Sequence, residues 1–382
     1  MSSTVGVFAF IFTLVVVIVV HEFGHYVAAK KSGMKVEEFF FGFGPRLFSW
    51  FKGETEYGIK AFPLGGYVKI AGMNPFQPVS AEDVPRTFGA RPSWQRAIVL
   101  LAGSTTHFIL AFLILLVLLG IVGIPTKVLP VVDSVKVEVN GEASPAQQAG
   151  LRPGDEIVAI NDERVLDWDG LKSKIRSHPN EEILLSIVRG DQRLRIPVTT
   201  VVAEAQLEAD PSKSEKVAQI GFIPRVANER LGPGKAVVES AKTTGELIWG
   251  SIGGVRSIFS FDVFKKVFNG LMNRGTRSAE DSPIGIYGAG RAAGQVAAAG
   301  GYSDLISFLV FFIVFLGVIN LVPLPPLDGG HLLVLAIEKV IGRKIDLKKL
   351  VPVATLVLGF FMFLFVALLY LDIARPIANP FQ

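Results

Sequence analysis

Four long apolar runs divide the chain. They cover residues 5–20, 97–124, 305–322 and 351–371, and few or no charged side chains interrupt them. About 20 apolar residues form a helix long enough to cross the roughly 30 Å hydrocarbon layer of a bilayer. The first run reaches this length if its helix continues past Val20. The pattern therefore predicts about four transmembrane helices.

The segment between the second and third runs is more polar and follows a different pattern. Short β-like stretches occur at residues 129–139, 156–160, 183–188 and 194–198, with a helical pattern at 169–178. This order predicts a compact α/β domain of about 75 residues.

The residues after this small domain carry weaker signals. Residues 204–216 are polar and predict a flexible linker. Residues 235–259 have the periodicity of an amphipathic helix, which would lie on the membrane surface or pack against the small domain. A glycine- and alanine-rich stretch at 285–301 precedes the third run. The predicted parts of the chain are thus residues 1–124, 125–203, 204–303 and 304–382.

Composition supports a membrane protein. Half of the 382 residues are hydrophobic and only 19% are charged, too few for an ordinary soluble chain of this length. No positive charge precedes the first run and no cleavage-like motif follows it, so we expect a retained span and not a signal peptide. The chain has no cysteine, which excludes disulfide bonds and thiolate chemistry.

Basic residues indicate how the chain is oriented. The formal net charge is +4, but the basic side chains lie mainly beside the ends of apolar runs, so no nucleic-acid partner is expected. They gather after the first run and between the third and fourth runs, which predicts that both loops are cytoplasmic. Both termini and the long segment between the second and third runs would then lie on the opposite side. The basic residues of the two predicted cytoplasmic loops are Lys30, Lys31, Lys35, Arg46, Lys339, Arg343, Lys344, Lys348 and Lys349.

The most specific motif follows the first run directly, as His21, Glu22, Phe23, Gly24 and His25. On a continuing helix the two histidines share a face, so both imidazoles can reach one Zn²⁺. Glu22 lies beside them, where it can take a proton from zinc-bound water. Ionisable residues near membrane depth are costly, and a function explains them better than side chains that merely extend to water at the interface.

A catalytic zinc needs a third protein ligand. The best candidate is Asp328, in the sequence NLVPLPPLDGGH at residues 320–331. Three prolines and two glycines break the third run here, and broken backbone at membrane depth is tolerated only where it is buried in protein or lines a cavity. In the predicted orientation the first and third spans both end on the cytoplasmic side. His178 lies in the small domain and is remote.

Two parts of the chain resemble known families. The sequence AGLRPGD at residues 149–155 resembles a PDZ domain, with no clear carboxylate-binding loop, and a generic small α/β domain is the alternative. Nearly the whole chain resembles the site-2 protease family of intramembrane zinc metalloproteases, especially bacterial members with one PDZ domain. The family's HExxH matches at His21, Glu22 and His25. Its NxxPxPxxDGG matches at Asn320, Pro323, Pro325, Asp328, Gly329 and Gly330.

The resemblance implies roles for these residues. Asp328 would be the third zinc ligand and Glu22 the general base, while Asn320, with Pro323 and Pro325, would help to hold the substrate. Many members carry Gly-Pro-x-x-Asn in the second span, whereas this chain has GSTTH at residues 103–107. We therefore expect His107 to be a polar neighbour of the site and, like His331, not a ligand.

The family also places a membrane-associated β-hairpin near the active site. Residues 62–73 form a β-like stretch bounded by glycines. A free strand edge at Gly66, Tyr67 and Val68 would pair with an extended substrate, and a hairpin that only faces solvent is the alternative.

The implied fold is a polytopic α-helical membrane protein with a membrane-associated β-hairpin and an inserted extracytoplasmic PDZ domain. The implied activity is regulated intramembrane proteolysis in a bacterial cytoplasmic membrane, with the active site towards the cytoplasm. Its substrates would be single-span membrane proteins in the lipid bilayer, such as anti-sigma factors or signal-peptide remnants, already shortened by an upstream site-1 protease. A zinc-binding scaffold would not need Glu22, and a metal transporter would need a second set of intramembrane ligands.

Overall fold

The computed structural model describes residues 3–74, 76–139, 141–207, 210–272, 277 and 282–377. It consists of two compact units. One unit combines Met1–Leu118 with Gly232–Gln382, and the other is Leu119–Leu231. The second unit is therefore an insertion in the first.

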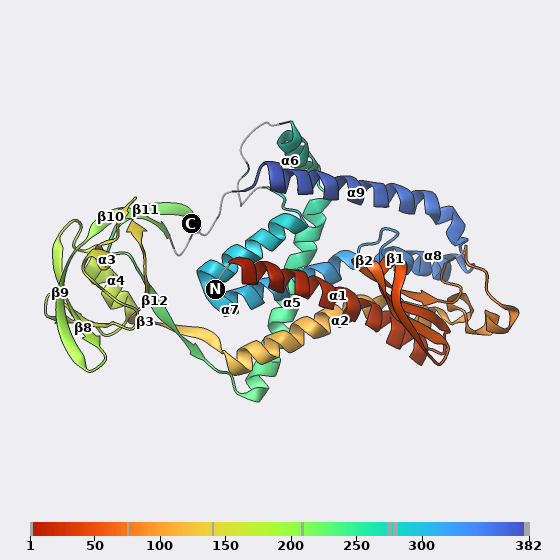
Figure 1. Ribbon diagram of the computed structural model, residues 1–382, viewed down its shortest axis with the longest axis horizontal. Helices are drawn as coiled ribbons and strands as arrows, with labels where there is room; N and C mark the ends of the chain where they lie inside the picture. The colour runs from red at the N-terminus through yellow and green to blue at the C-terminus, as the bar shows by residue number, and fades with distance from the viewer. Residues whose placement is uncertain are drawn as a thin grey trace. The chain divides into compact units, whose positions relative to one another are not determined.

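The first unit, here called the membrane unit, is mainly helical (Figure 1). Its long helices contain the first and fourth predicted apolar runs and all but the last two or three residues of the second and third. In chain order its elements are α1 (Ser3–Lys31), β1 (Val36–Lys52), β2 (Thr55–Ile70), η1 (Ala81–Arg86), η2 (Phe88–Ala90), α2 (Ser93–Ile121), α5 (Pro233–Ile258), α6 (Phe261–Leu271), α7 (Ile286–Asn320), α8 (Asp328–Ile341), η3 (Leu347–Leu350) and α9 (Val351–Ala374).

Four helical segments of the described chain are long and apolar enough to cross a membrane. They are α1, α2, the Tyr302–Asn320 part of α7, and Lys348–Ala374, which contains α9. Helices α5 and α6, bent by 58° at their junction, together also have the length and hydropathy of a span. The expected four spans are thus present, and the chain is a multi-pass membrane protein.

Helix α1 packs closely against α2 and α7 because small residues lie at both crossings. A side chain at Gly24 would meet the carbonyl oxygen of Ala102 in α2 at 2.5 Å. One at Gly6 would meet that of Ala293 in α7 at 2.4 Å. Small residues at such crossings let transmembrane helices approach each other. The glycine- and alanine-rich stretch before the third span is thus the first part of α7, which lies beside α1 (Figure 1).

Strands β1 and β2 form an antiparallel hairpin directly after α1. The β-like stretch expected at residues 62–73 is the second half of β2, which ends at Ile70, and the turn after it. Glu54, at its turn, accepts hydrogen bonds from Arg86 at 2.7 Å and from Lys30 at 2.6 Å. The bonds from Arg86 and then Lys30 lower the pKa of Glu54 to about 2, so this carboxylate is charged at neutral pH. It ties the hairpin to the end of α1.

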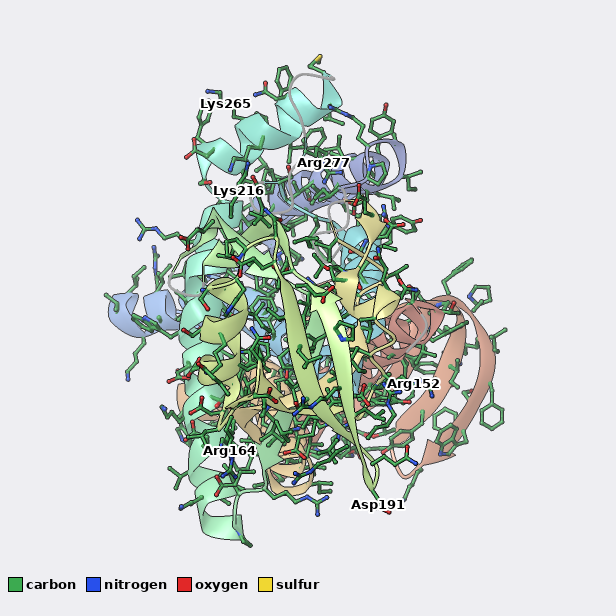
Figure 2. All side chains as sticks on the ribbon, turned by 90° about the vertical axis from the view of Figure 1, so that its left-hand side faces the viewer. Arg152, Arg164, Asp191, Lys216, Lys265 and Arg277 are labelled. Atoms are coloured by element: carbon green, nitrogen blue, oxygen red, sulfur yellow. The ribbon has the colours of Figure 1, made fainter. Side chains whose placement is uncertain are left out.

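The inserted unit is built around a six-stranded sheet with the strand order β12–β3–β6–β8–β9, in which β7 pairs with β6. Ile157, Leu171, Ile183 and Leu185 are fully buried in its core. Figure 2 shows Asp191 at the tip of the β8–β9 hairpin. The elements are β3 (Ile124–Val135), β4 (Glu138–Val139), β5 (Glu142–Ala143), α3 (Pro145–Gln148), β6 (Glu156–Ile160), β7 (Glu163–Arg164), α4 (Trp168–Arg176), β8 (Glu182–Arg189), β9 (Gln192–Thr199), β10 (Val201–Leu207), β11 (Asp210–Gln219) and β12 (Phe222–Glu229).

The inserted unit is larger than the small domain expected from the sequence. The described part of residues 204–216, expected to be a flexible linker, belongs to the antiparallel hairpin of β10 and β11. Strand β12 then pairs with β3, at the start of the unit. The linker expectation is wrong because a polar segment becomes a strand when another segment, here the next one in the chain, supplies partners for its backbone hydrogen bonds. The helix expected at 235–259 is α5.

The two ends of the inserted unit lie next to each other. The backbone N–H of Leu231 donates to the carbonyl of Leu119 at 3.2 Å. A side chain at Gly123 would meet the carbonyl oxygen of Glu229 at 2.3 Å, so the chain enters and leaves through one narrow stem.

Candidate metal centre

Three side chains place donor atoms around one point: His21 and His25 of α1, and Asp328 at the start of α8. The Nε2 atoms of the two histidines are 3.1 Å apart. Oδ2 of Asp328 lies 3.3 Å from Nε2 of His21 and 3.2 Å from Nε2 of His25. A tetrahedral ion with bonds of about 2.1 Å separates its ligands by about 3.4 Å. This donor triangle therefore has the size of one face of a zinc tetrahedron.

The Asp328 carboxylate supports a metal at this point. Its Oδ2 atom is buried and has no hydrogen-bond donor among the described residues. A buried carboxylate oxygen without a donor is costly, and a cation held by the donor triangle would stabilise it. The residues present thus fit a zinc ion.

Helix α2 holds the two imidazoles in place. Nδ1 of His25 donates to the backbone carbonyl of Val99 at 2.7 Å, which leaves Nε2 free for a metal. Gly103 packs against both rings, since a methyl group there would lie 2.4 Å from Nε2 of His25 and 2.8 Å from Nε2 of His21. A larger residue at this position would displace one or both ligands.

Asp328 reaches the triangle because the third span is broken. Helix α7 ends at Asn320, and the following turn folds back against the start of α8. A side chain at Gly329 would meet the carbonyl oxygen of Leu321 at 2.1 Å, and one at Gly330 would meet the nitrogen of Pro325 at 2.3 Å. The two glycines therefore allow the close return of the chain that places Asp328 at the first position of α8.

A buried ion pair connects α8 to α2. Nη1 of Arg96 lies 2.8 Å from Oε2 of Glu338, and each side chain is about 10% exposed or less. The other oxygen of Glu338 accepts a hydrogen bond from the backbone of Ile345 at 3.0 Å. Removing one member of such a pair is strongly destabilising, because the remaining charge stays buried. The pair thus fixes the helix that carries Asp328 to the helix that supports both histidines.

Glu22 lies between the donor triangle and strand β2. A side chain at Gly66 would come within 3.1 Å of Cγ of Glu22, and the backbone N–H of Val68 faces the Glu22 carboxylate. Tyr67, between them, points to the other face of the strand, where its hydroxyl donates to Glu38. Of the three strand residues expected to pair with a substrate, Gly66 and Val68 therefore adjoin Glu22. Tyr67 instead stabilises the hairpin through its side chain.

The remaining residues singled out in the sequence lie at different distances from the triangle. Asn320 is half-buried at the end of α7, and Pro323 and Pro325 lie in the turn that follows. His331 donates Nδ1–H to the carbonyl of Leu327 at 3.3 Å and does not belong to the donor triangle. His178 belongs to the inserted unit.

His107 does adjoin the triangle, with Nε2 3.1 Å from Nδ1 of His21. Gly103 was not predicted as part of the site, although the sequence pointed to it. This residue lies four positions before His107, on the same face of an apolar helix, and a glycine on that face indicates a close approach of another helix. Nothing in the sequence indicated that Arg96 and Glu338 form a pair.

The chain is similar to known proteins over most of its length. Peptidase family M50 matches residues 9–366, which include the donor triangle and the inserted unit. Zinc metalloprotease Rip1 of Mycolicibacterium smegmatis is 31% identical over 359 residues, covering 89% of this chain and 87% of that protein. Regulator of sigma-W protease RasP of Bacillus subtilis is 28% identical, with 97% and 98% of the two chains covered. Zinc metalloprotease Rip1 of Mycobacterium tuberculosis is 27% identical, with 100% and 99% covered.

Proposed function

Because this chain belongs to peptidase family M50, the site-2 protease family of zinc metalloproteases, we propose that it cuts single-span membrane proteins in or near their transmembrane helix. The observation that carries this proposal is the donor triangle of His21, His25 and Asp328, built on apolar helices with Glu22 beside it. A zinc site on membrane-spanning helices suits a substrate that lies in the membrane, whereas a soluble substrate would not require it.

In the proposed reaction His21, His25 and Asp328 would hold the zinc ion, and Glu22 moves the proton. A zinc ion in this triangle would supply a Lewis acid for the scissile carbonyl and lower the pKa of a water molecule. Glu22 takes a proton from the attacking water and delivers it to the departing amide nitrogen. A scaffold that only stored zinc would have no use for this carboxylate.

The substrate helix must unwind before it is cut, because each carbonyl inside a helix is already hydrogen-bonded. Strand β2 is suited to hold the unwound chain, since Gly66 and Val68 adjoin Glu22. A cleft of about 350 Å³ continues along the strand from Tyr67 to Ile70 and reaches His331. We infer that an extended substrate pairs with this edge and that the side-chain amide of Asn320 holds it from the other side.

The direct test is cleavage of a panel of single-span helices by the purified chain in lipid vesicles. We expect fragments cut in or near the membrane segment, loss of cleavage after zinc is removed with a chelator, and its return when zinc is added. Substrates whose helices carry a helix-breaking residue near the cut should be cleaved faster, because they unwind at lower cost. Intact substrates throughout the panel, with zinc bound, would favour the scaffold instead.

The name of one relative suggests a class of substrate. The name of the Bacillus subtilis relative connects that protein to the regulation of sigma-W. We propose membrane-anchored regulators of this kind, such as anti-sigma factors, or signal-peptide remnants, after a site-1 protease has shortened them. The basic loops after α1 and after α8 would face the cytoplasm, with the termini and the inserted unit outside.

The inserted unit would then restrict access as a PDZ domain, and its narrow stem allows a clean test. Deleting residues 130–202 would cut through the sheet and leave β12 without its partner. Replacing residues 124–229 with a short glycine–serine linker removes the unit at its stem. We expect this variant to cleave substrates that still carry their full extracytoplasmic domain, which the parent should leave uncut. Unchanged selectivity would contradict the gating role, provided that both proteins cut shortened substrates.

A further inference from the structure

His107 makes hydrogen bonds through both of its ring nitrogens. It lies in α2 and is only 2% exposed. Nδ1 is 3.2 Å from the carbonyl oxygen of Ile313 in α7, and Nε2 is 3.1 Å from Nδ1 of His21. The imidazole thus bridges α7 and one corner of the donor triangle.

These contacts determine where each proton lies. A carbonyl oxygen can only accept, so the Nδ1 atom of His107 must carry the hydrogen that reaches Ile313. A neutral imidazole has one donor and one acceptor, so the Nε2 atom of His107 accepts. Nδ1 of His21 is therefore the donor in their shared bond. This leaves the lone pair of His21 on Nε2, the atom that faces His25 and Asp328.

We propose that His107 is a positioning residue for metal binding, which fixes the tautomer and the ring orientation of His21. The ring orientations of the two histidines of the triangle are then fixed by different hydrogen bonds. His25 donates directly to the backbone carbonyl of Val99, as metal-binding histidines commonly do. Among the described residues, Nδ1 of His21 bonds to the ring of His107 alone, and Nδ1 of that ring in turn bonds to the carbonyl of Ile313.

A glycine of α7 lets the two helices approach closely beside His107. A methyl group at Gly317 of α7 would lie 3.0 Å from Cβ of His107 and 2.8 Å from the ring of Phe108. The bare backbone at this point lets α7 approach α2 closely enough for the Ile313 carbonyl to meet the ring. Helix α7, which ends at the turn leading to Asp328, is thereby also connected to His21.

The test compares side chains of similar length that differ in one property, the presence of an acceptor. Glutamine and methionine are similar in length, but only the amide oxygen of glutamine can take the place of Nε2 of His107 and accept the His21 N–H. We expect His107→Met to weaken zinc binding by about 10- to 100-fold, the usual cost of losing such a partner. His107→Gln should stay within a few-fold of the parent. Ser104→Ala, which changes a buried side chain of α2 with no hydrogen bond to the part of the chain that the structure describes, should leave zinc affinity unchanged.

Zinc affinity is measured on the full chain in detergent by competition with a chromogenic chelator. The visible absorption of the Co²⁺-loaded protein reports the ligand geometry and should change in His107→Met but not in His107→Gln. If His107→Met lowers the melting temperature of the metal-free protein, His107→Leu supplies a second side chain without an acceptor for comparison with His107→Gln. Equal zinc affinity of the Gln variant and both acceptor-free variants would overturn the proposal, as would a Met variant that binds zinc like the parent.

This inference rests on the zinc site of the proposed protease but not on proteolysis. A chain that shows the expected order of zinc affinities and cuts no substrate would refute the proposed function and leave the role of His107 standing. Normal cleavage with equal zinc affinities in all variants would refute the role of His107 and leave the proposed function standing.

Discussion

Replacing Glu22 with glutamine should abolish cleavage and leave the zinc content unchanged. The amide has nearly the same size as the carboxylate but cannot take a proton from the attacking water. General-base catalysis contributes about 10²- to 10⁴-fold to the rate, so we expect a loss at least in this range. Glu22 is not part of the donor triangle, and therefore metal binding should survive. Cleavage of a single-span substrate in vesicles and the zinc content of the purified protein measure the two effects.

The matched control is Glu246→Gln, which removes a carboxylate from the exposed surface of α5. It should cleave like the parent. The Glu22→Gln variant should also still bind the uncut substrate, because the strand edge of β2 is intact. Cleavage by this variant at the parent rate would refute the assigned mechanism. Loss of zinc together with activity would instead show that Glu22 supports the metal.

Replacing Asp328 with alanine should remove most of the bound zinc from a protein that otherwise contains about one ion per chain. Two histidines on one helix cannot hold a catalytic zinc without a third protein ligand. The loss of affinity should exceed the roughly 100-fold that marks the upper end for a supporting residue. Asp328→Asn tests the charge at constant size and should also lose zinc. The metal content is measured by atomic spectrometry after dialysis against a weak chelator.

Asp304→Asn is the control for this series, since it changes an exposed carboxylate of α7 outside the triangle. It should keep its zinc. The melting temperature of the metal-free Asp328→Ala protein should not fall, because the buried Oδ2 atom has no donor to lose among the described residues. An Asp328→Ala protein with full zinc content and full activity would show that another residue completes the site.

Local features of the sequence predicted the parts of the site that depend on one segment at a time. The apolar runs identified the spans because a helix must satisfy its backbone hydrogen bonds within itself in a bilayer. The spacing of His21 and His25 placed both on one helix face, and α1 carries them there. Prolines and glycines around Asp328 marked the broken span, because these residues act on the backbone directly.

Strand pairing was not predictable in the same way. Residues 204–216 had the composition of a linker, yet most of them lie in the local β10–β11 hairpin, and β12 joins the distant strand β3 across the whole inserted unit. The pairing of a strand depends on a partner that its own residues do not specify. The same holds for the Arg96–Glu338 pair, whose members are 242 positions apart in the chain.

The sequence by itself predicted several membrane spans and named His21, His25 and Asp328 as the candidate metal ligands. These predictions follow from residue type, from the spacing of the two histidines and from the prolines and glycines that break the third span. Only the tertiary structure decided that the three donor atoms lie 3.1 to 3.3 Å apart, that Gly103 packs against both imidazoles, and that His107 bonds to His21. The packing of α1, α2, α7 and α8 sets these distances, and such packing depends on many side chains at once.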